Sequence, residues 1–131
     1  MAEHRCALAV RSYEYDSFGH VNNAVYLNYL ELARHELLKY LGVSVDKLRE
    51  AGYFLVAARV CIDYKLQAKQ DDALTIATRP LEKGRTSGVF SQNIYRGDEL
   101  VAQAEVTWAC INSAGRLVRL PTELDIPELG S

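Results

Sequence analysis

The sequence has few cysteines, no excess of positive charge and no long hydrophobic run. Its three cysteines, Cys6, Cys61 and Cys110, lie far apart, and none belongs to a CxxC pair. Such a set supports neither a disulfide framework nor a zinc site, so we expect free, buried thiols in a reducing compartment. No apolar run approaches the ~20 residues that cross a membrane, and the N-terminal residues lack the apolar core of a signal peptide. We therefore expect a cytoplasmic protein with no membrane insertion.

A strongly basic character is also missing. The 131 residues include 15 Lys and Arg against 17 Asp and Glu, which gives a formal net charge of −2. Nucleic acids and anionic membranes select basic proteins, so neither is expected as the main partner. A small anionic ligand held by a few local cations stays open. The length and a hydrophobic content of 49% are typical of one folded domain, which would span residues 1–131.

Several common catalytic motifs are absent. The chain contains no GxSxG elbow, no GxxxxGK[ST] loop and no GxGxxG turn. Glu31 and His35 have a helical spacing that can hold a metal, but no third ligand is near, so a solvated pair is the better interpretation. The other histidines, His4 and His20, are too dispersed for a metal cluster. We expect neither a metal nor an organic cofactor.

A strand and a long helix are predicted in the first third of the chain. Residues 4–15 alternate, with Cys6, Leu8 and Val10 on one side, which predicts a first strand. A helix is predicted from a cap at Asn22 or Asn23 to the glycine at position 42. Its polar stripe is narrow, so we expect this helix to be covered on most sides. The apolar positions that define the helix recur at steps of three and four: Tyr26, Tyr29, Leu30, Ala33, Leu37, Tyr40 and Leu41.

The remainder of the sequence predicts strands. A short helix over 43–53 is followed by alternating segments at 54–68, 72–83, 85–96 and 99–112, separated by turn residues, and 116–121 is a candidate extension. One dominant helix followed by a meander of strands indicates an α+β fold with an antiparallel sheet packed on the helix. Such a sheet leaves an edge strand uncovered, so we expect pairing into at least a dimer.

The polar segment DSFGHVNN at 16–23 joins the first strand to the long helix, and its acid, Asp16, has two interpretations. A loop aspartate commonly accepts a hydrogen bond from the backbone in an Asx-turn, or caps a helix. The alternative is catalytic. The start of the helix offers unpaired N–H groups and the positive end of the helix dipole, which suit an oxyanion. A carboxylate nearby would then serve as general base or nucleophile on an acyl carbon.

The segment VRSYEYDSFGHVNNAVYLNYLELARHELL, residues 10–38, resembles the acyl-CoA thioesterases of the hotdog-fold superfamily. It is most similar to the 4-hydroxybenzoyl-CoA thioesterase-like branch, in particular its long-chain acyl-CoA and fatty acyl thioesterases. The pattern is an aspartate, three residues, HVNN and a tyrosine-containing helix. The resemblance continues through VSVDKLREAG at 43–52 and VTWACINSAGRLVRLP at 106–121.

The resemblance implies a sheet of about five strands wrapped around one long helix. It also implies dimers, often assembled into homotetramers, with active sites at subunit interfaces, and a place in fatty acid metabolism. Asp16 matches the catalytic carboxylate of that family. The backbone N–H that polarises the thioester carbonyl falls at Asn23, and Gly19 matches a position where the branch often carries glycine.

Other candidate site residues have weaker support. His20 either orients Asp16, the water or the thioester, or bonds to the loop backbone. Tyr26 and Tyr29 have the spacing of helix-core aromatics, and in the alternative they line an acyl tunnel. Cations are needed for the phosphates of CoA, although turn-flanking cations are usually just solvated. The candidates flank the strand 85–96, with two weaker ones on the strand 54–68: Lys83, Arg85 and Arg96, then Arg59 and Lys65.

We therefore predict hydrolysis of a thioester of CoA or acyl carrier protein to a carboxylic acid and a thiol. Asp16 would act as general base or nucleophile and the Asn23 N–H as oxyanion donor. One alternative is an acyl-thioester hydratase or dehydratase that uses Asp16 and His20. Another is a non-catalytic acyl-CoA binding module. The sequence leaves open the acyl chain length and the identity of the thiol carrier.

Overall fold

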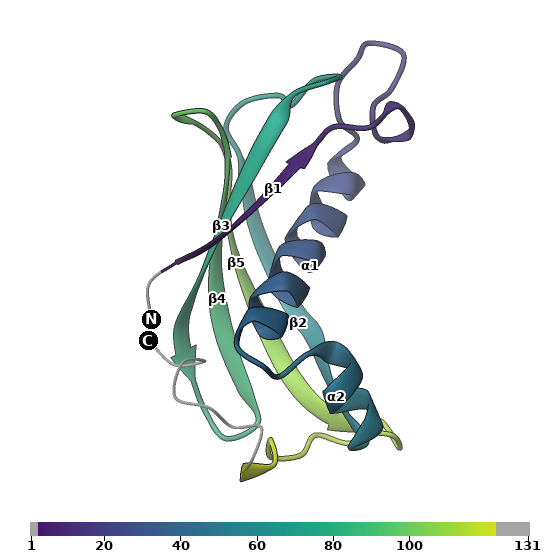
Figure 1. The fold of residues 1–131 in the computed structure, drawn as a ribbon, viewed down its shortest axis with the longest axis vertical. Helices are drawn as coiled ribbons and strands as arrows, with labels where there is room; N and C mark the ends of the chain where they lie inside the picture. Colours follow the sequence, from purple (N-terminus) through teal and green to yellow (C-terminus); the bar gives the residue numbers. More distant parts are fainter. Residues whose placement is uncertain (1–2, 123–131) are drawn as a thin grey trace.

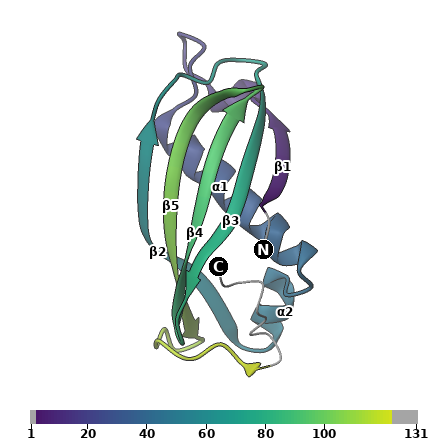
Figure 2. The same cartoon turned by 90° about the vertical axis from the view of Figure 1, so that its left-hand side faces the viewer.

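One antiparallel sheet of five strands curls around a long helix (Figure 1). The structure is a computed structural model, which describes residues 3–122. The sheet order is β1-β3-β4-β5-β2, so β1 and β2 are its two edges, as Figure 2 shows. The predicted α+β architecture is confirmed. In chain order the elements are β1 (His4–Ala9), η1 (Ser12–Glu14), α1 (Asn23–Tyr40), α2 (Val45–Glu50), β2 (Tyr53–Tyr64), β3 (Ala73–Lys83), β4 (Ser87–Arg96) and β5 (Glu99–Asn112).

The long helix α1 begins and ends where its capping residues predict. Asn22 is the N-cap, and its side-chain oxygen accepts a hydrogen bond from the N–H of Ala24 at 2.9 Å. At the other end Gly42 has φ +82°, the left-handed conformation that glycine adopts without strain. Most of the predicted apolar face lies in the core; Tyr40 instead is 70% exposed.

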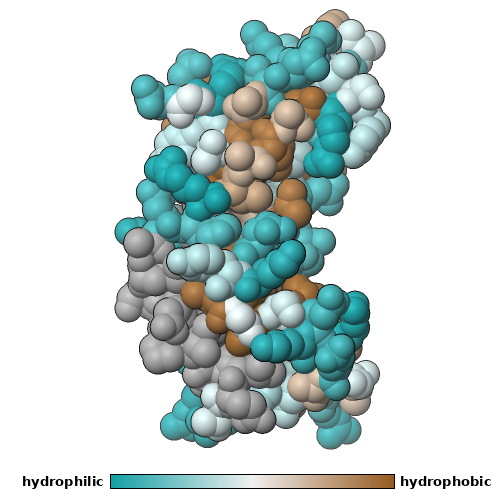
Figure 3. Space-filling view, in the orientation of Figure 1, coloured by the Kyte–Doolittle hydropathy of each residue, from teal (hydrophilic) through white to brown (hydrophobic). Residues whose placement is uncertain are grey.

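The side of α1 away from the sheet is not covered. Leu27 and Leu32, at the two margins of this uncovered side, are 43% and 37% exposed. The prediction that α1 is covered on most sides is therefore wrong for the single chain. Figure 3 shows hydrophobic surface in the upper half of the molecule, where β1 and α1 lie in Figure 1.

The core has two apolar clusters with a polar group between them. The upper cluster includes Tyr29, and the lower one includes Leu37 and Trp108. On β4, Phe90 belongs to the lower cluster and Ile94 to the upper one. Gln92, which lies between them on the same face of β4, is fully buried.

Several predicted boundaries and exposures differ from the structure. The first strand ends at Ala9 because a 3₁₀ turn follows at Ser12–Glu14, and the strand predicted over 54–68 ends at Tyr64. The segment 116–121 contributes a single bridge, Ile111 with Leu117, rather than a strand. Cys110 is buried as expected, Cys6 is half-buried, and Cys61 is exposed, because it lies on the outer face of an edge strand. Within residues 3–122 no helix is both long and apolar enough to cross a membrane.

Candidate active site

The segment between β1 and α1 folds into a loop that is closed by its own backbone. Tyr15 pairs with Val21 in an antiparallel bridge. The Asp16 N–H donates to the carbonyl of His20, and the Gly19 N–H donates to the carbonyl of Asp16, both at 2.9 Å. Gly19 has φ +76°, so this tight turn requires the conformational freedom that the sequence provides there.

The carboxylate of Asp16 is bound on one side and exposed on the other. Its Oδ1 accepts hydrogen bonds from the N–H groups of Phe18 at 2.9 Å and His20 at 3.2 Å. The turn-forming interpretation of Asp16 is therefore confirmed. Oδ2 has no donor among residues 3–122, and the residue is exposed, so this oxygen is open to a ligand. The imidazole of His20 makes no hydrogen bond in the described part of the chain, whereas its backbone bonds to Asp16 at both N–H and carbonyl.

The start of α1 follows this loop directly and presents a free donor. Asn22 N–H donates to the carbonyl of Glu14 at 3.1 Å. The next N–H, of Asn23, has no acceptor among residues 3–122, and it lies at the positive end of the helix dipole. The Tyr64 hydroxyl donates to the carbonyl of Asn23 at 3.3 Å, which ties the end of β2 to the start of α1. The loop thus holds an exposed carboxylate, and the helix start that follows it presents an unpaired amide.

Glu14 anchors the loop, and sequence reasoning missed it. It is 6% exposed. Its carboxylate accepts hydrogen bonds from the Tyr29 hydroxyl at 3.0 Å and the Arg11 N–H at 2.8 Å, and it pairs with Arg11 Nε at 3.3 Å. Burial, together with the bond to Glu14, raises the pKa of Tyr29 and keeps the phenol neutral. Nothing local in the sequence distinguishes this acid from an exposed one, because its partner Tyr29 lies on another element.

The two helix tyrosines are buried and hydrogen-bonded. Tyr29 and Tyr26 are each 1% exposed. The Tyr26 hydroxyl accepts a hydrogen bond from the N–H of Ala68 at 3.0 Å, and burial raises its pKa. The segment after β2 is thereby held against the helix, and Lys69 forms a bridge with His20. Both rings lie in the core, as their helical spacing predicts.

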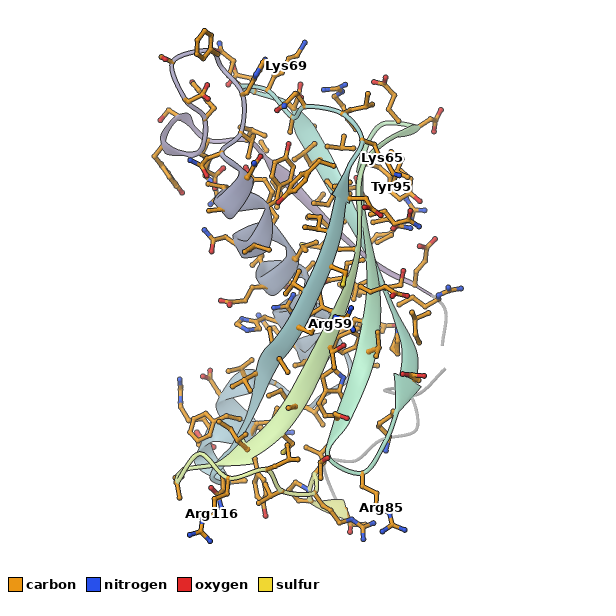
Figure 4. The ribbon with its side chains drawn as sticks, turned by 180° about the vertical axis from the view of Figure 1, so that it is seen from behind. Arg59, Lys65, Lys69, Arg85, Tyr95 and Arg116 are labelled. Atoms are coloured by element: carbon orange, nitrogen blue, oxygen red, sulfur yellow. The ribbon has the colours of Figure 1, made fainter. Side chains whose placement is uncertain are left out.

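The cations predicted to bind CoA phosphates do not gather at one place. Figure 4 shows Arg85 at the opposite end of the molecule from Lys65 and Lys69. Arg96 is engaged with carboxylates: its Nη1 lies 2.8 Å from Asp72 and its Nε 3.3 Å from Glu99. Partial burial opposes the ionisation of Asp72, but hydrogen bonds from Arg96 and the Lys69 N–H outweigh it, so the pKa of Asp72 is lowered.

Lys83 ends β3 and lies at the same end as Arg85. Sequence reasoning treated Lys69 only as a turn residue, yet its backbone forms a bridge with His20 of the Asp16 loop. Arg59 is on β2, midway between the two ends.

A partly open cavity of about 340 Å³ lies toward the other end of α1, lined by residues of α1, α2 and the start of β2, with Phe90 and Trp108 of the sheet. Asp16 does not line it. Its walls are mainly apolar and include Leu38, Leu48 and Trp108, with Arg34 among them. Glu31 and His35, which have metal-ligand spacing, also line it, and the described residues contain no cluster of three or more metal-ligating side chains.

Comparison with known proteins decides the family. The family model of the thioesterase-like superfamily matches residues 10–127. The chain belongs to this superfamily. A crystal structure of a probable thioesterase from Bartonella henselae superposes with a TM-score of 0.87 at 30% identity, over 92% of this chain and 100% of that one. The resemblance of residues 10–38 to hotdog-fold thioesterases, and the hotdog fold itself, are thereby confirmed.

Two relatives of this chain have names that state a biochemical activity. Long-chain acyl-CoA thioesterase FadM of Escherichia coli is 35% identical over 107 residues, which are 80% of each protein. The chloroplastic acyl-acyl carrier protein thioesterase ATL3 of Arabidopsis thaliana is 30% identical over 129 residues, covering 92% of this chain. The chain spans 65% of the length of ATL3 and of its relative ATL2.

Proposed function

We propose that this protein hydrolyses acyl thioesters of CoA or acyl carrier protein to a free carboxylic acid and a thiol. The proposal is supported by a loop that holds the exposed Asp16 carboxylate and runs directly into the start of α1, where the Asn23 N–H has no acceptor among residues 3–122, in a chain of the thioesterase-like superfamily. Relatives named for acyl-CoA and for acyl carrier protein substrates support both thiol carriers.

In the proposed mechanism the thioester carbonyl oxygen accepts a hydrogen bond from the Asn23 N–H. The positive end of the α1 dipole strengthens that bond as charge develops on the oxygen. Asp16 Oδ2 either removes a proton from the attacking water or attacks the acyl carbon itself, and in both routes water supplies the hydroxyl of the acid. The C–S bond breaks, and the thiolate leaves and takes up a proton. The loop bonds from Phe18 and His20 hold Oδ1, which fixes the direction of Oδ2.

The sequence also predicts cations that bind the phosphates of CoA, an oligomeric state, a compartment and a metabolic role, and these stay proposals. Among the cations, Lys69 and Lys65 are better placed than Lys83 and Arg85 to contact the phosphates of CoA within one protomer, because they lie at the Asp16 end. A homodimer or homotetramer, a cytoplasmic location and a role in fatty acid metabolism stay predictions.

The direct test is a thiol-trapping assay with saturated acyl-CoA substrates of increasing chain length, and with acyl carrier protein thioesters. We expect thiol release that depends on chain length. Saturable binding of acyl-CoA without thiol release would instead indicate a binding module. Incubation with crotonyl-CoA, followed by its enoyl absorbance, tests the hydratase alternative. We expect no loss of that absorbance beyond thioester cleavage, because the His20 imidazole forms no pair with Asp16 among the described residues.

A further inference from the structure

One side of α1 approaches the edge strand β2 at two places, a hydrogen bond near the start of the helix and the cavity farther along it. Leu27, Glu31, Arg34 and Leu38 recur at helical steps and form one stripe, which we call the β2-facing stripe. The last three line the cavity together with β2 residues 54–57. At the other end Asn23 lies on the same side of α1, and its carbonyl is bound by Tyr64 of β2. Figure 2 shows α1 crossing the sheet from the β2 side, where the helix starts, toward the β1 side, where it ends.

The surface between the two ends of this stripe is partly apolar and exposed. Leu27 is 43% exposed on α1. Val60 on β2 is 37% exposed although its pairing partner Val106, on the inner face of the sheet, is fully buried. This exposed apolar surface is compatible with a hydrocarbon chain that leads from the Asn23 N–H toward the cavity. Arg34 lies about 16 Å from Asn23 along the helix, which an extended acyl chain can span.

Arg34 is a fixed cation in a mainly apolar wall, which also contains Glu31, His35 and Arg49. Its Nη1 donates to Gln92 Oε1 at 3.0 Å. Two further hydrogen bonds fix the orientation of the Gln92 amide: its Nε2 donates to the carbonyl of Leu30 and to Thr78 Oγ1, both at 3.0 Å. Gln92 and Thr78 are both fully buried, so the guanidinium is held by a network that has no freedom to move away.

The guanidinium has more donors than this network uses. Arginine carries five N–H donors, and one of them is engaged by Gln92. No carboxylate in the described residues forms an ion pair with Arg34; burial lowers its pKa, and the attraction of Glu31 offsets this only in part. Arg49, the other arginine of the lining, is paired with Asp46. A partly buried cation without a counter-ion is costly unless a ligand supplies the acceptor.

We propose that Arg34 and this cavity form a specificity subsite for the far end of the acyl group, and that this end carries an acceptor oxygen, most strongly a carboxylate. The inference rests on the proposed thioesterase function and names its substrate class: an acyl thioester whose hydrocarbon part ends in, or bears near its end, an oxygen that the guanidinium binds. Leu38, Leu48 and Trp108 contact the hydrocarbon, and the Arg34 donors left free by Gln92 bind the oxygen.

The single tryptophan of the chain gives a binding assay that does not depend on hydrolysis. Trp108 lines the cavity, and its indole N–H is buried without an acceptor, so its fluorescence responds to a ligand that enters. We expect decanoate to change this fluorescence saturably, whereas decylamine, which has the same chain and the opposite charge, does not. In Arg34→Met the affinity for decanoate should fall at least about tenfold, and Arg34→Lys should restore part of it.

The second readout is the ratio of kcat/KM for the mono-CoA thioester of decanedioic acid to that for decanoyl-CoA. We expect the ratio to be about ten or more in the wild type and to approach one in Arg34→Met. Arg79→Met, which removes an exposed arginine of β3, is the matched control and should leave the ratio unchanged. Ala57→Leu, which narrows the cavity from the exposed edge strand without removing Arg34, should weaken decanoate binding if Arg34→Met does not fold.

The two proposals fail in different ways. If the wild type cleaves no thioester, the proposed function is wrong, and the fluorescence titration alone decides the subsite. If thioesters are cleaved but decanoate leaves Trp108 fluorescence unchanged, or Arg34→Met retains the wild-type substrate ratio, Arg34 is a structural residue and the inference is overturned.

Discussion

Glu14 and Asp16 lie on either side of Tyr15, and the fold uses their carboxylates in opposite ways. Glu14 is buried and satisfied by Arg11 and Tyr29, so it serves to hold the base of the loop against the helix. Asp16 is exposed at the tip, where only Oδ1 is bound. A general base needs a fixed loop and a carboxylate oxygen that is free to accept a proton. The anchored loop and the unbound oxygen of Asp16 fit the role proposed for it.

Replacing Asp16 with asparagine separates the two roles of this side chain. The Oδ1 of an asparagine can still accept from Phe18 and His20, so the loop and the melting temperature should be preserved. The basic oxygen is lost, and we expect kcat for thiol release to fall about 100-fold or more. Asp98→Asn, in the exposed turn after β4, is the control and should retain wild-type kcat. Near-normal turnover in purified Asp16→Asn would exclude Asp16 from the chemistry.

Replacing Tyr29 with phenylalanine tests the anchor. The variant leaves the buried Glu14 carboxylate without one of its donors, so the free energy of unfolding should fall by about 1.5–3 kcal/mol. Tyr40→Phe, at a position that is 70% exposed, should change it by less than about 0.5 kcal/mol. Urea denaturation measures both. Equal stabilities of the two variants would show that the Tyr29–Glu14 bond contributes little.

At the scale of elements, the packing of β4 on β5 depends on a glycine, which has no side chain. Gly88 pairs with Trp108 across these strands. A Cβ at position 88 would lie 2.6–2.7 Å from three atoms of the buried indole ring. The glycine therefore gives the indole the space it occupies in the lower core cluster and beside the cavity.

Gly88→Ala should consequently destabilise the protein by about 1–3 kcal/mol and shift the fluorescence of Trp108, because a buried ring has little room to move. Gly84→Ala is the matched control: its Cβ would meet the nearest atom, Ser87 O, at 3.6 Å, an ordinary contact. Thermal denaturation and the emission maximum test both variants. A Gly88→Ala protein with wild-type stability would mean that the indole relocates at no cost.

The elements themselves were largely predictable, and the exceptions have local causes. Capping residues and glycines mark the ends of α1, which is why its predicted limits agree with the structure. The strand predicted over 4–15 stops at Ala9 because Glu14 turns inward to Tyr29, a partner that periodicity cannot reveal. The register shift in β3 falls between Pro80 and Glu82, where proline lacks an N–H for the ladder.

At the scale of the whole molecule, β2 is a long strand with one unpaired edge. It spans Tyr53–Tyr64, and its inner-face residue Val60 and outer-face residue Val56 are 37% and 38% exposed. An uncovered apolar edge of this length favours pairing with another chain. We expect the β2 edges of two copies to meet, which would place the exposed Val56 and Val60 of each copy near the interface.

Sedimentation equilibrium tests this expectation. The wild type should sediment as a dimer or a larger assembly, and Val60→Lys should shift it toward the monomer, because two lysines would be brought together at the edge. Lys at this exposed position should leave the monomer fold intact, which circular dichroism would verify. A wild type that remains monomeric at every concentration would contradict the expected pairing.

The sequence by itself determined the order of the elements, the α+β class, the family and the loop that carries Asp16, because periodicity, caps and the Asp-to-HVNN spacing are local signals. Only the tertiary structure decided that Glu14 anchors the loop and that Arg96 forms an ion pair with Asp72. It alone also decided that Arg34 is hydrogen-bonded to Gln92 and lines a mainly apolar cavity. The physical reason is that each of these roles depends on a partner far away in the chain. A charged residue has the same appearance in a sequence whether its partner is water or a buried side chain.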